Sequence, residues 1–291
     1  MKESKDGILT LFVIFILVGL AWQPVKDSQK NAKNNQHNNQ QISPITSPPL
    51  IQTENQIKVD KTRSPYFDKV SMSYVSSLNN PNPSSEFISL YTNLEAGEKV
   101  NVTGWRLESE RSGNSVKIGQ ASVLPYPNTK NYEDVVLKQG DIVYLVKGFS
   151  PVGISFRTNK CSGFFAEDRA FYPSLQRACP SPSKESLPRF SNNLDQDDEC
   201  RTLIERIPAC TTPATSINFT KLSDTLPQSC KDYLKTKINY NTCLATHFND
   251  SDFALREWYV YLNIFGPLWR DKYEKITLYD NSGLVVSSFS Y

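Results

Sequence analysis

The residues best suited to covalent chemistry in this 291-residue chain are its six cysteines. They are Cys161, Cys179, Cys200, Cys210, Cys230 and Cys243. No two are spaced as C-x-x-C, the pattern of thiol redox motifs and of many zinc sites. Thiols in this number, without such a motif, are typical of structural disulfides in an oxidising compartment. We therefore predict that all six form disulfides and that the body of the chain lies outside the cytoplasm.

The connectivity of six cysteines is open, because fifteen pairings exist. Cys161 and Cys179 bracket a loop of about 18 residues, which a disulfide between them would close. For the other four, an antiparallel helical hairpin would bring Cys210 to Cys230 and Cys200 to Cys243. The metal alternative places Cys243 and His247 on one helical face as half of a zinc site. Nothing supplies the other half, so we expect a disulfide and no metal site.

Acid–base catalysis has a single candidate, His247, because the other histidine, His37, lies in a polar linker. Asp250 and Asp252 could orient its ring, but they also suit helix caps, and no hydroxyl or free thiol is marked as its partner. The nucleophile elbow and both glycine-rich phosphate-binding motifs are absent. We expect no catalytic residue and no cofactor; the alternative is an envelope hydrolase that uses His247 as its general base.

Aromatic and basic residues gather around the first cysteine and could form a binding surface. They are Phe156, Arg157, Lys160, Phe164 and Phe165. Aromatic and arginine side chains often anchor interfaces, so this loop could hold a partner protein or an acidic envelope polymer. The competing hypothesis is that the phenylalanines fill a small satellite core. A net charge of +2 does not favour specific nucleic-acid binding.

The elements that must position these residues are mostly short β-strands. With 38% hydrophobic and 21% charged residues, the chain can form a core and is not wholly disordered. Apolar and polar residues alternate between turn residues, which is typical of half-buried strands. The expected strands span residues 67–78, 86–94, 100–109, 115–119, 135–148 and 275–291, the last a hairpin around Asn281, Ser282 and Gly283. Strands of this length and spacing predict a mainly β fold, a β-sandwich.

Four strings in these strands, EFISLYTN, VNVTGWRL, LKQGDIVYLV and ITLYDNSGLVVSSFSY, resemble the lamin tail domain family. The resemblance covers residues 66–148 and 275–291 and rests mainly on Gly104 and Trp105 together with the closing hairpin. It implies an immunoglobulin-like sandwich and an interaction module. On physical grounds, Trp105 can fill the gap between two sheets, Gly104 allows a tight turn, and Glu86 begins a strand. We interpret all three residues as structural.

The chain departs from that family between residues 150 and 271, which contain every cysteine. Apolar residues recur at helical spacing near residues 203–207 and 233–238, and Asp252 could cap a third helix through residue 262. We therefore expect a disulfide-rich helical insertion between the first part of the sandwich, residues 65–149, and its closing hairpin, residues 272–291.

The amino-terminal residues predict a membrane anchor and a spacer. Residues 8–22 are uncharged and almost wholly apolar, and the stretch 7–25 would span ~28 Å as a helix, close to the ~30 Å of a bilayer core. No A-x-A-like cleavage site follows, so we expect an uncleaved transmembrane anchor at residues 1–25. The Asn-, Gln- and Pro-rich residues 26–64 predict a disordered linker. The sequence as a whole thus predicts a single-pass, noncatalytic binding or scaffolding protein of the cell envelope, with a purely structural spacer as a further alternative.

Overall fold

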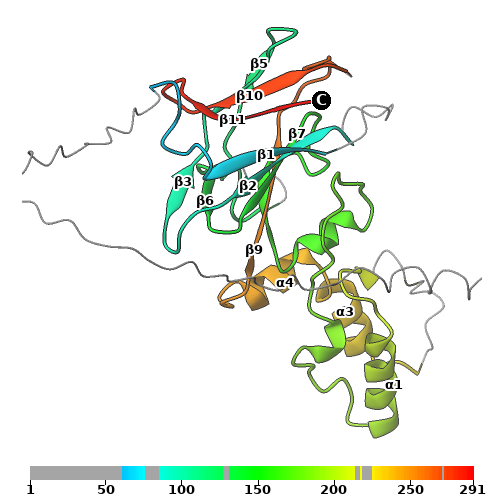
Figure 1. Ribbon diagram of the computed structural model, residues 1–291. Helices are drawn as coiled ribbons and strands as arrows, with labels where there is room; N and C mark the ends of the chain where they lie inside the picture. The colour runs from blue at the N-terminus through cyan, green and yellow to red at the C-terminus, as the bar shows by residue number, and fades with distance from the viewer. Residues whose placement is uncertain (1–60, 76–84, 127–130, 214–216, 218–224, 271) are drawn as a thin grey trace, which may run out of the picture. The chain divides into compact units, whose positions relative to one another are not determined.

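The computed structural model describes residues 61–75, 85–126, 131–213, 217, 225–270 and 272–291 (Figure 1). The predicted anchor and residues 26–60 of the predicted linker lie outside this part of the chain. Among the described residues, no helix has the length and apolar character needed to cross a membrane. Three sheets, a small helical region and three disulfides make up the described fold, so the predicted β-rich class with a disulfide-containing helical region is confirmed.

The largest sheet has five strands. Their order is β1 (Val70–Val75), β2 (Phe87–Thr92), β7 (Ile142–Val146), β9 (Ala254–Tyr261) and β8 (Phe156–Asn159). Neighbouring strands are antiparallel except for β7 and β9, which are parallel. Because β7 and β9 run in the same direction, the chain between them must cross over, and the cysteine-rich segment makes that crossover.

A four-stranded sheet contains the closing hairpin. Its order is β11 (Val285–Ser290), β10 (Lys275–Tyr279), β4 (Arg106–Ser109) and β5 (Ser115–Lys117). A third, two-stranded sheet pairs β3 (Lys99–Asn101) with β6 (Val136–Lys138). The predicted strand 100–109 is therefore divided between two sheets, and the division falls at Gly104, whose φ is +83°.

One hydrophobic core joins the two larger sheets. Ile88 and Leu90 of β2 are buried in the same cluster as Ile276 and Leu278 of β10. Each pair is spaced by two residues, so each strand turns one face inward. The closing hairpin, predicted to complete the fold begun by residues 65–149, thus shares a core with β2, although some 190 residues separate these strands along the chain.

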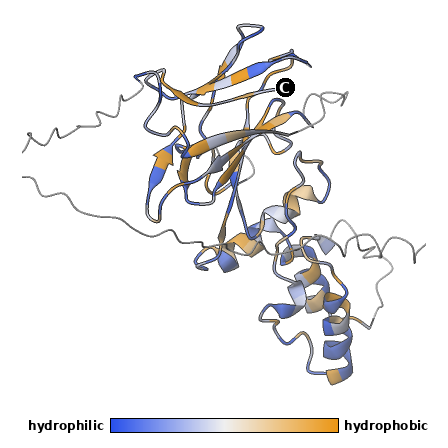
Figure 2. Cartoon of the chain, viewed as in Figure 1, coloured by the Kyte–Doolittle hydropathy of each residue, from blue (hydrophilic) through white to orange (hydrophobic). Residues whose placement is uncertain are grey.

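The helical region comprises α1 (Leu194–Glu205), α3 (Gln228–Thr236) and α4 (Tyr240–His247), with the short 3-10 helices η2 (Ser162–Ala166) and η3 (Pro182–Lys184). Figure 2 shows α1 as mainly hydrophilic. Its few buried residues, with those of α3, form a small core of their own around Cys200, Ile204, Cys230 and Leu234. The helix α4 contributes instead to a separate cluster on the five-stranded sheet.

The predicted third helix at residues 252–262 is wrong, because this segment forms β9. Its side chains alternate between two cores: Trp258 and Val260 lie in the cluster between the sheets, and Tyr259 and Tyr261 lie in the cluster on the other face. A central strand that is buried on both faces reads as a continuous apolar run, which periodicity does not separate from a buried helix.

The predicted boundaries of the insertion also need correction. Residues 150–271 are not wholly a separate helical module, because β8 and β9 lie within them and belong to the five-stranded sheet. The helices fall between Ser162 and His247.

Candidate functional site

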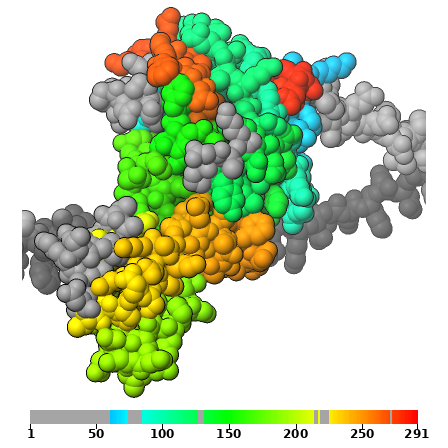
Figure 3. All heavy atoms as spheres, turned by 180° about the vertical axis from the view of Figure 1, so that it is seen from behind, coloured from blue at the N-terminus to red at the C-terminus, as the bar shows by residue number. Residues whose placement is uncertain are grey.

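The helix α4 positions the sole histidine among the described residues, His247, at its carboxyl end. The side chain of Asn239 accepts a hydrogen bond from the backbone N–H of Thr242 and so caps the start of this helix. Tyr240 and Leu244, four residues apart, pack into the core on the five-stranded sheet. Cys243 is joined to Cys161, which directly precedes η2. Figure 3 shows α4, in orange, against the green segments that precede it in the chain.

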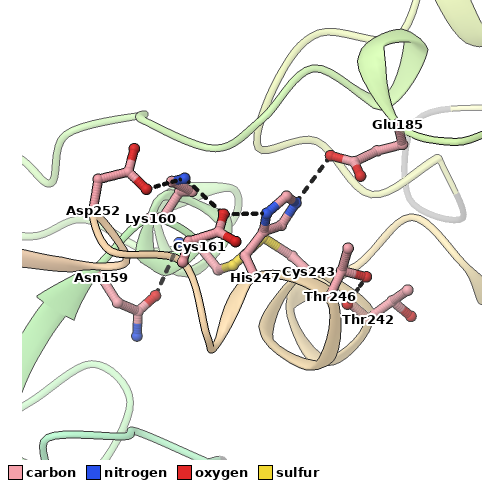
Figure 4. A network of polar contacts seen from close by, with 10 residues as sticks. Asn159, Lys160, Cys161, Glu185, Thr242, Cys243, Thr246, His247 and Asp252 are labelled. Atoms are coloured by element: carbon pink, nitrogen blue, oxygen red, sulfur yellow. Dashed lines mark hydrogen bonds and ion pairs between the residues drawn. A yellow bond between two sulfur atoms is a disulfide. The ribbon is translucent and has the colours of Figure 1, made fainter.

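Both ring nitrogens of His247 face carboxylates (Figure 4). Nδ1 lies 2.8 Å from Oδ2 of Asp250, and Nε2 lies 3.0 Å from Oε1 of Glu185. The ammonium group of Lys160 extends the network, at 2.9 Å from Asp250 and 2.5 Å from Asp252. The His247 side chain is 15% exposed, whereas that of Asp252 is 74% exposed, so the network is largely buried at the ring and open to water at its other end. The network links the end of β8, the turn after α4 and the segment after η3.

The electrostatics of the site favour the charged forms of His247, Asp250 and Lys160. Burial alone would lower the pKa of the His247 imidazole, but its hydrogen bonds to Asp250 and Glu185 outweigh burial and raise that pKa above its ordinary value. Hydrogen bonds from Lys160 and then from His247 lower the pKa of Asp250. Those to Asp252 and Asp250 raise the pKa of Lys160.

This geometry does not suit general-base catalysis. A base needs a free lone pair, whereas both nitrogens of His247 are engaged with carboxylates. The neighbouring sulfur of Cys243 is held in a disulfide and so provides no thiol nucleophile. Asp250 and Glu185 meet different nitrogens, so the two carboxylates and the ring do not converge on one point. In the described part of the chain, no group of three or more His, Cys, Asp or Glu side chains is placed to hold a metal ion.

A cavity of about 270 Å³ adjoins the histidine. Its walls come from the segment around η3, from α3 and from α4. The lining residues are Phe164, Pro180, Pro182, Glu185, Ser186, Tyr233, Lys237, Ile238, Asn239, Thr242, Cys243, Thr246 and His247. The prolines and the aromatic rings make part of the wall apolar, and Lys237 and Glu185 add an ammonium group and a carboxylate. The cavity can therefore accept a small group that has apolar and polar parts.

The phenylalanines predicted to form an exposed binding loop are largely core residues. Phe156 and Phe165 are buried, so the prediction that they are exposed is wrong. The Phe156 ring stacks on Tyr259, with centroids 5.5 Å apart, and the Phe165 ring lies 4.4 Å from that of Tyr240. They fill the satellite core that the competing hypothesis described. Phe164 is half-buried and lines the cavity.

The two predicted basic binding residues are engaged within the fold. Arg157 donates from Nε to the carbonyl of Leu255, lies 3.5 Å from Asp141, and stacks over the ring of Trp258 at 5.3 Å. Lys160 is paired with two aspartates. Because Phe156 and Arg157 sit on a strand, β8, they point to opposite faces of the sheet and do not form one surface.

All six cysteines are paired, as predicted, but none of the pairings considered from the sequence is formed. The disulfides join Cys161 to Cys243, Cys179 to Cys210, and Cys200 to Cys230, in place of Cys161–Cys179, Cys210–Cys230 and Cys200–Cys243. The predicted hairpin treated residues 230–243 as one helix. The structure divides it at Asn239, which caps α4 as a new helix, so Cys230 and Cys243 pack in different cores.

Gly163 lies against the second disulfide, Cys179–Cys210, and was not predicted from the sequence. An added Cβ there would lie 2.3 Å from Sγ of Cys210 and 3.1 Å from Sγ of Cys179. The second disulfide therefore requires a glycine at this position. Nothing in the local sequence marks it, because the contact forms only when distant cysteines pair.

The three residues interpreted as structural lie in or beside the sheets. Trp105 is 1% exposed and packs against Tyr66 with ring centroids 5.5 Å apart. Gly104 approaches Asn281 of the closing hairpin so closely that a Cβ would stand 2.7 Å from its Oδ1. Glu86 forms an ion pair with Lys147 at 2.6 Å, next to the pairing of β2 with β7.

Comparison with known proteins adds no relative: no family model, no curated protein and no solved structure matches this chain.

Proposed function

We propose that this chain is a noncatalytic, membrane-anchored binding or scaffolding protein of the cell envelope, with its folded body outside the cytoplasm. The observation that carries the proposal is the pairing of all six cysteines in three disulfides. Reducing conditions in the cytosol oppose such bonds, so an oxidising compartment suits this body. The apolar residues 8–22 of the sequence would provide the anchor.

The surroundings of His247 support a noncatalytic role over an envelope hydrolase. Its two nitrogens face Asp250 and Glu185, and the nearby Cys243 is oxidised. A hydrolase that used this ring as general base would need one nitrogen directed at a hydroxyl, thiol or water.

For the sheets, we propose an immunoglobulin-like sandwich similar to the lamin tail domain. Trp105 is buried between strands of both large sheets, and the turn at Gly104 contacts Asn281 of the closing hairpin. The two features on which the resemblance rests, the Gly104–Trp105 pair and the hairpin, thus meet in space. The crossover between β7 and β9 would be the insertion that distinguishes this chain from that family.

Binding is proposed at the cavity beside His247. It lies at the junction of η3, α3 and α4, and its wall combines apolar rings with the charges of Lys237 and Glu185. A partner would place one side chain or a similarly small group there. This assignment replaces the loop at residues 156–165, whose side chains are used within the fold.

Fractionation of cells that make the full-length protein tests its location. We expect the chain to stay with membranes after alkaline extraction and its body to be degraded when protease is added outside the cytoplasmic membrane. A body that remains protected until that membrane is broken, with reduced cysteines, would contradict the proposal.

Capture experiments with the full-length protein and cell-envelope material test binding. Lys237→Ala should reduce capture if the cavity is the site, because Lys237 is exposed and its loss should leave the fold intact. Lys235→Ala, also exposed on α3 but not in the cavity wall, is the matched control. Equal capture by both variants would refute the cavity as the binding site, and absence of any captured partner would favour a structural spacer.

A further inference from the structure

The contact between His247 and Glu185 joins two segments that are 62 residues apart and that both line the cavity. Glu185 directly follows η3, in the same stretch as the lining residues Pro180, Pro182 and Ser186. His247 ends α4. Figure 4 shows Glu185 and Lys160 on opposite sides of the imidazole ring. The ring therefore connects the η3 segment to the polar network at the end of β8.

The number of protons on the ring decides whether both contacts can exist. Ionised carboxylates only accept hydrogen bonds, so Asp250 and Glu185 can both be satisfied only when both ring nitrogens carry a hydrogen. This condition defines the imidazolium ion. A neutral imidazole has one N–H, and its other nitrogen would turn a lone pair toward a carboxylate oxygen. Loss of one proton thus removes the positive charge from both ion pairs of the ring and one of its two hydrogen bonds.

The two carboxylates differ in how well they tolerate that loss. Asp250 is three residues from His247 and also pairs with Lys160, so its charge stays compensated. Glu185 makes its one ion pair within the described residues to His247. The remaining titratable and charged groups near the network are Asp252, which faces Lys160, and Tyr233 and Lys237, which line the cavity from α3 and its carboxyl end. Deprotonation of His247 should therefore break the contact with Glu185 before the contact with Asp250.

We propose that His247 is a pH-sensitive clasp, whose protonated form holds the segment that carries Glu185 against α4 and whose deprotonation releases that segment and widens the cavity. The regulatory purpose rests on the proposed binding at this cavity, whereas the motion itself does not. The sign follows from the raised pKa of the ring. The clasp is fully closed below the unfolded-state pKa of about 6.5 and opens as the pH rises through the higher pKa of the folded state.

Hydrogen exchange on the full-length protein in detergent tests the clasp without any partner, so its failure is distinct from a failure of binding. After correction for intrinsic exchange rates, protection of residues 181–187 should fall as the pH rises through the pKa of His247. The fall should be about tenfold for each unit by which the pKa of His247 in the parent exceeds its pKa in Glu185→Gln. His247→Gln should remove this pH dependence. Unchanged protection across the titration, or the same pH dependence in His247→Gln, would overturn the proposal.

Two surface variants keep the test decisive if His247→Gln does not fold. Glu185→Gln removes the distant carboxylate, so it should lower the pKa of His247 in an NMR titration and should diminish the pH-dependent protection. Asp252→Asn is the matched control, because Asp252 is largely exposed and pairs with Lys160. It should retain the transition. A Glu185→Gln variant that titrates and exchanges as the parent does would refute the clasp.

Discussion

At Gly104 a turn between two sheets meets the closing hairpin, and two separate restrictions apply to this residue. Its φ of +83° disfavours any residue with a Cβ, and an added Cβ would also stand 2.7 Å from Oδ1 of Asn281. Gly97 has a similar φ of +85° but nothing within 4 Å of the Cβ position. Substitutions at both glycines would cause backbone strain, but only a substitution at Gly104 would also cause a steric clash.

We predict that Gly104→Ala lowers the free energy of unfolding by more than Gly97→Ala does. Gly97→Ala should lose about 1–2 kcal/mol through backbone strain alone. Gly104→Ala should lose that amount and a further contribution from displacing Asn281. Urea denaturation of both variants measures the difference. Equal losses would show that the contact with the hairpin does not restrict this position.

Trp105 offers a second prediction at the scale of one residue. Its ring is 1% exposed in the core shared by the two large sheets. Trp105→Ala should reduce the free energy of unfolding by about 3–5 kcal/mol, because it removes a buried aromatic ring and leaves a cavity. Phe265→Ala is the control, since this side chain is 81% exposed and its loss should change stability little. An unchanged urea midpoint for Trp105→Ala would show that the ring does not support the core.

Single residues could be interpreted from the sequence where their local pattern determined their environment. Trp105 follows a glycine in an alternating strand, and these two features predicted a turn and a buried ring. Phe156, Phe165 and Gly163 could not be interpreted in this way, because their surroundings come from residues far away in the sequence. Phe156 meets Tyr259 across a strand pair, and Gly163 meets a disulfide that joins residues 179 and 210.

At the scale of elements, the helices α1 and α3 form a unit with its own small core and its own disulfide, Cys200–Cys230. The bond closes a chain separation of 30 residues. In the chain-entropy model such a bond contributes about 3–4 kcal/mol to the stability of the segment it closes. Neither cysteine belongs to the core clusters on the five-stranded sheet.

We predict that the double variant Cys200→Ala, Cys230→Ala loosens α1 and α3 while the sheets stay folded. Hydrogen exchange should speed up in residues 194–205 and 228–236 and remain slow in β2, β7 and β9. Leu194→Ala, at a residue of α1 that is 67% exposed, should exchange as the parent does. Uniform loss of protection in helices and sheets alike would contradict the separation of the two cores.

The elements themselves were predictable where one face is buried and the other is wet. Alternation then marks the strand, as in β11 of the closing hairpin. The strand at residues 86–94 was found from its alternating sequence, although most of β2 is buried on both faces. β9 was not, because both of its faces are buried and its apolar run carries no period. The division between α3 and α4 at Asn239 was also missed, which misassigned the partners of Cys230 and Cys243.

At the scale of the whole molecule, we expect the buried carboxylate of Glu274 to influence how the free energy of unfolding changes at low pH. Glu274 is 1% exposed and lies between the loop that follows β9 and the turn after β4. Burial favours its neutral form, but hydrogen bonds from the N–H of Arg270, the hydroxyl of Ser109 and the N–H of Lys275 outweigh burial and lower its pKa. Its contribution to stability is therefore present above the unfolded-state pKa of about 4.3 and is lost as the pH falls through the lower folded-state pKa.

We expect Glu274→Gln to be less stable than the parent at pH 7 and to show a shallower loss of stability in acid. Urea denaturation at several pH values between about 2 and 7 measures both effects. Glu95→Gln, at an exposed carboxylate, is the control and should leave the acid dependence as it is. The same acid dependence in Glu274→Gln and the parent would refute the role assigned to this carboxylate.

The most direct test of the proposed extracytoplasmic body is the oxidation state and connectivity of its cysteines in the native protein. Protein isolated from its own cells, with free thiols alkylated before any reduction, is digested and mapped by mass spectrometry. We predict no alkylated cysteine and three linked peptide pairs, Cys161–Cys243, Cys179–Cys210 and Cys200–Cys230. Alkylation at any of the six, and above all at Cys243 together with bound zinc, would contradict the account.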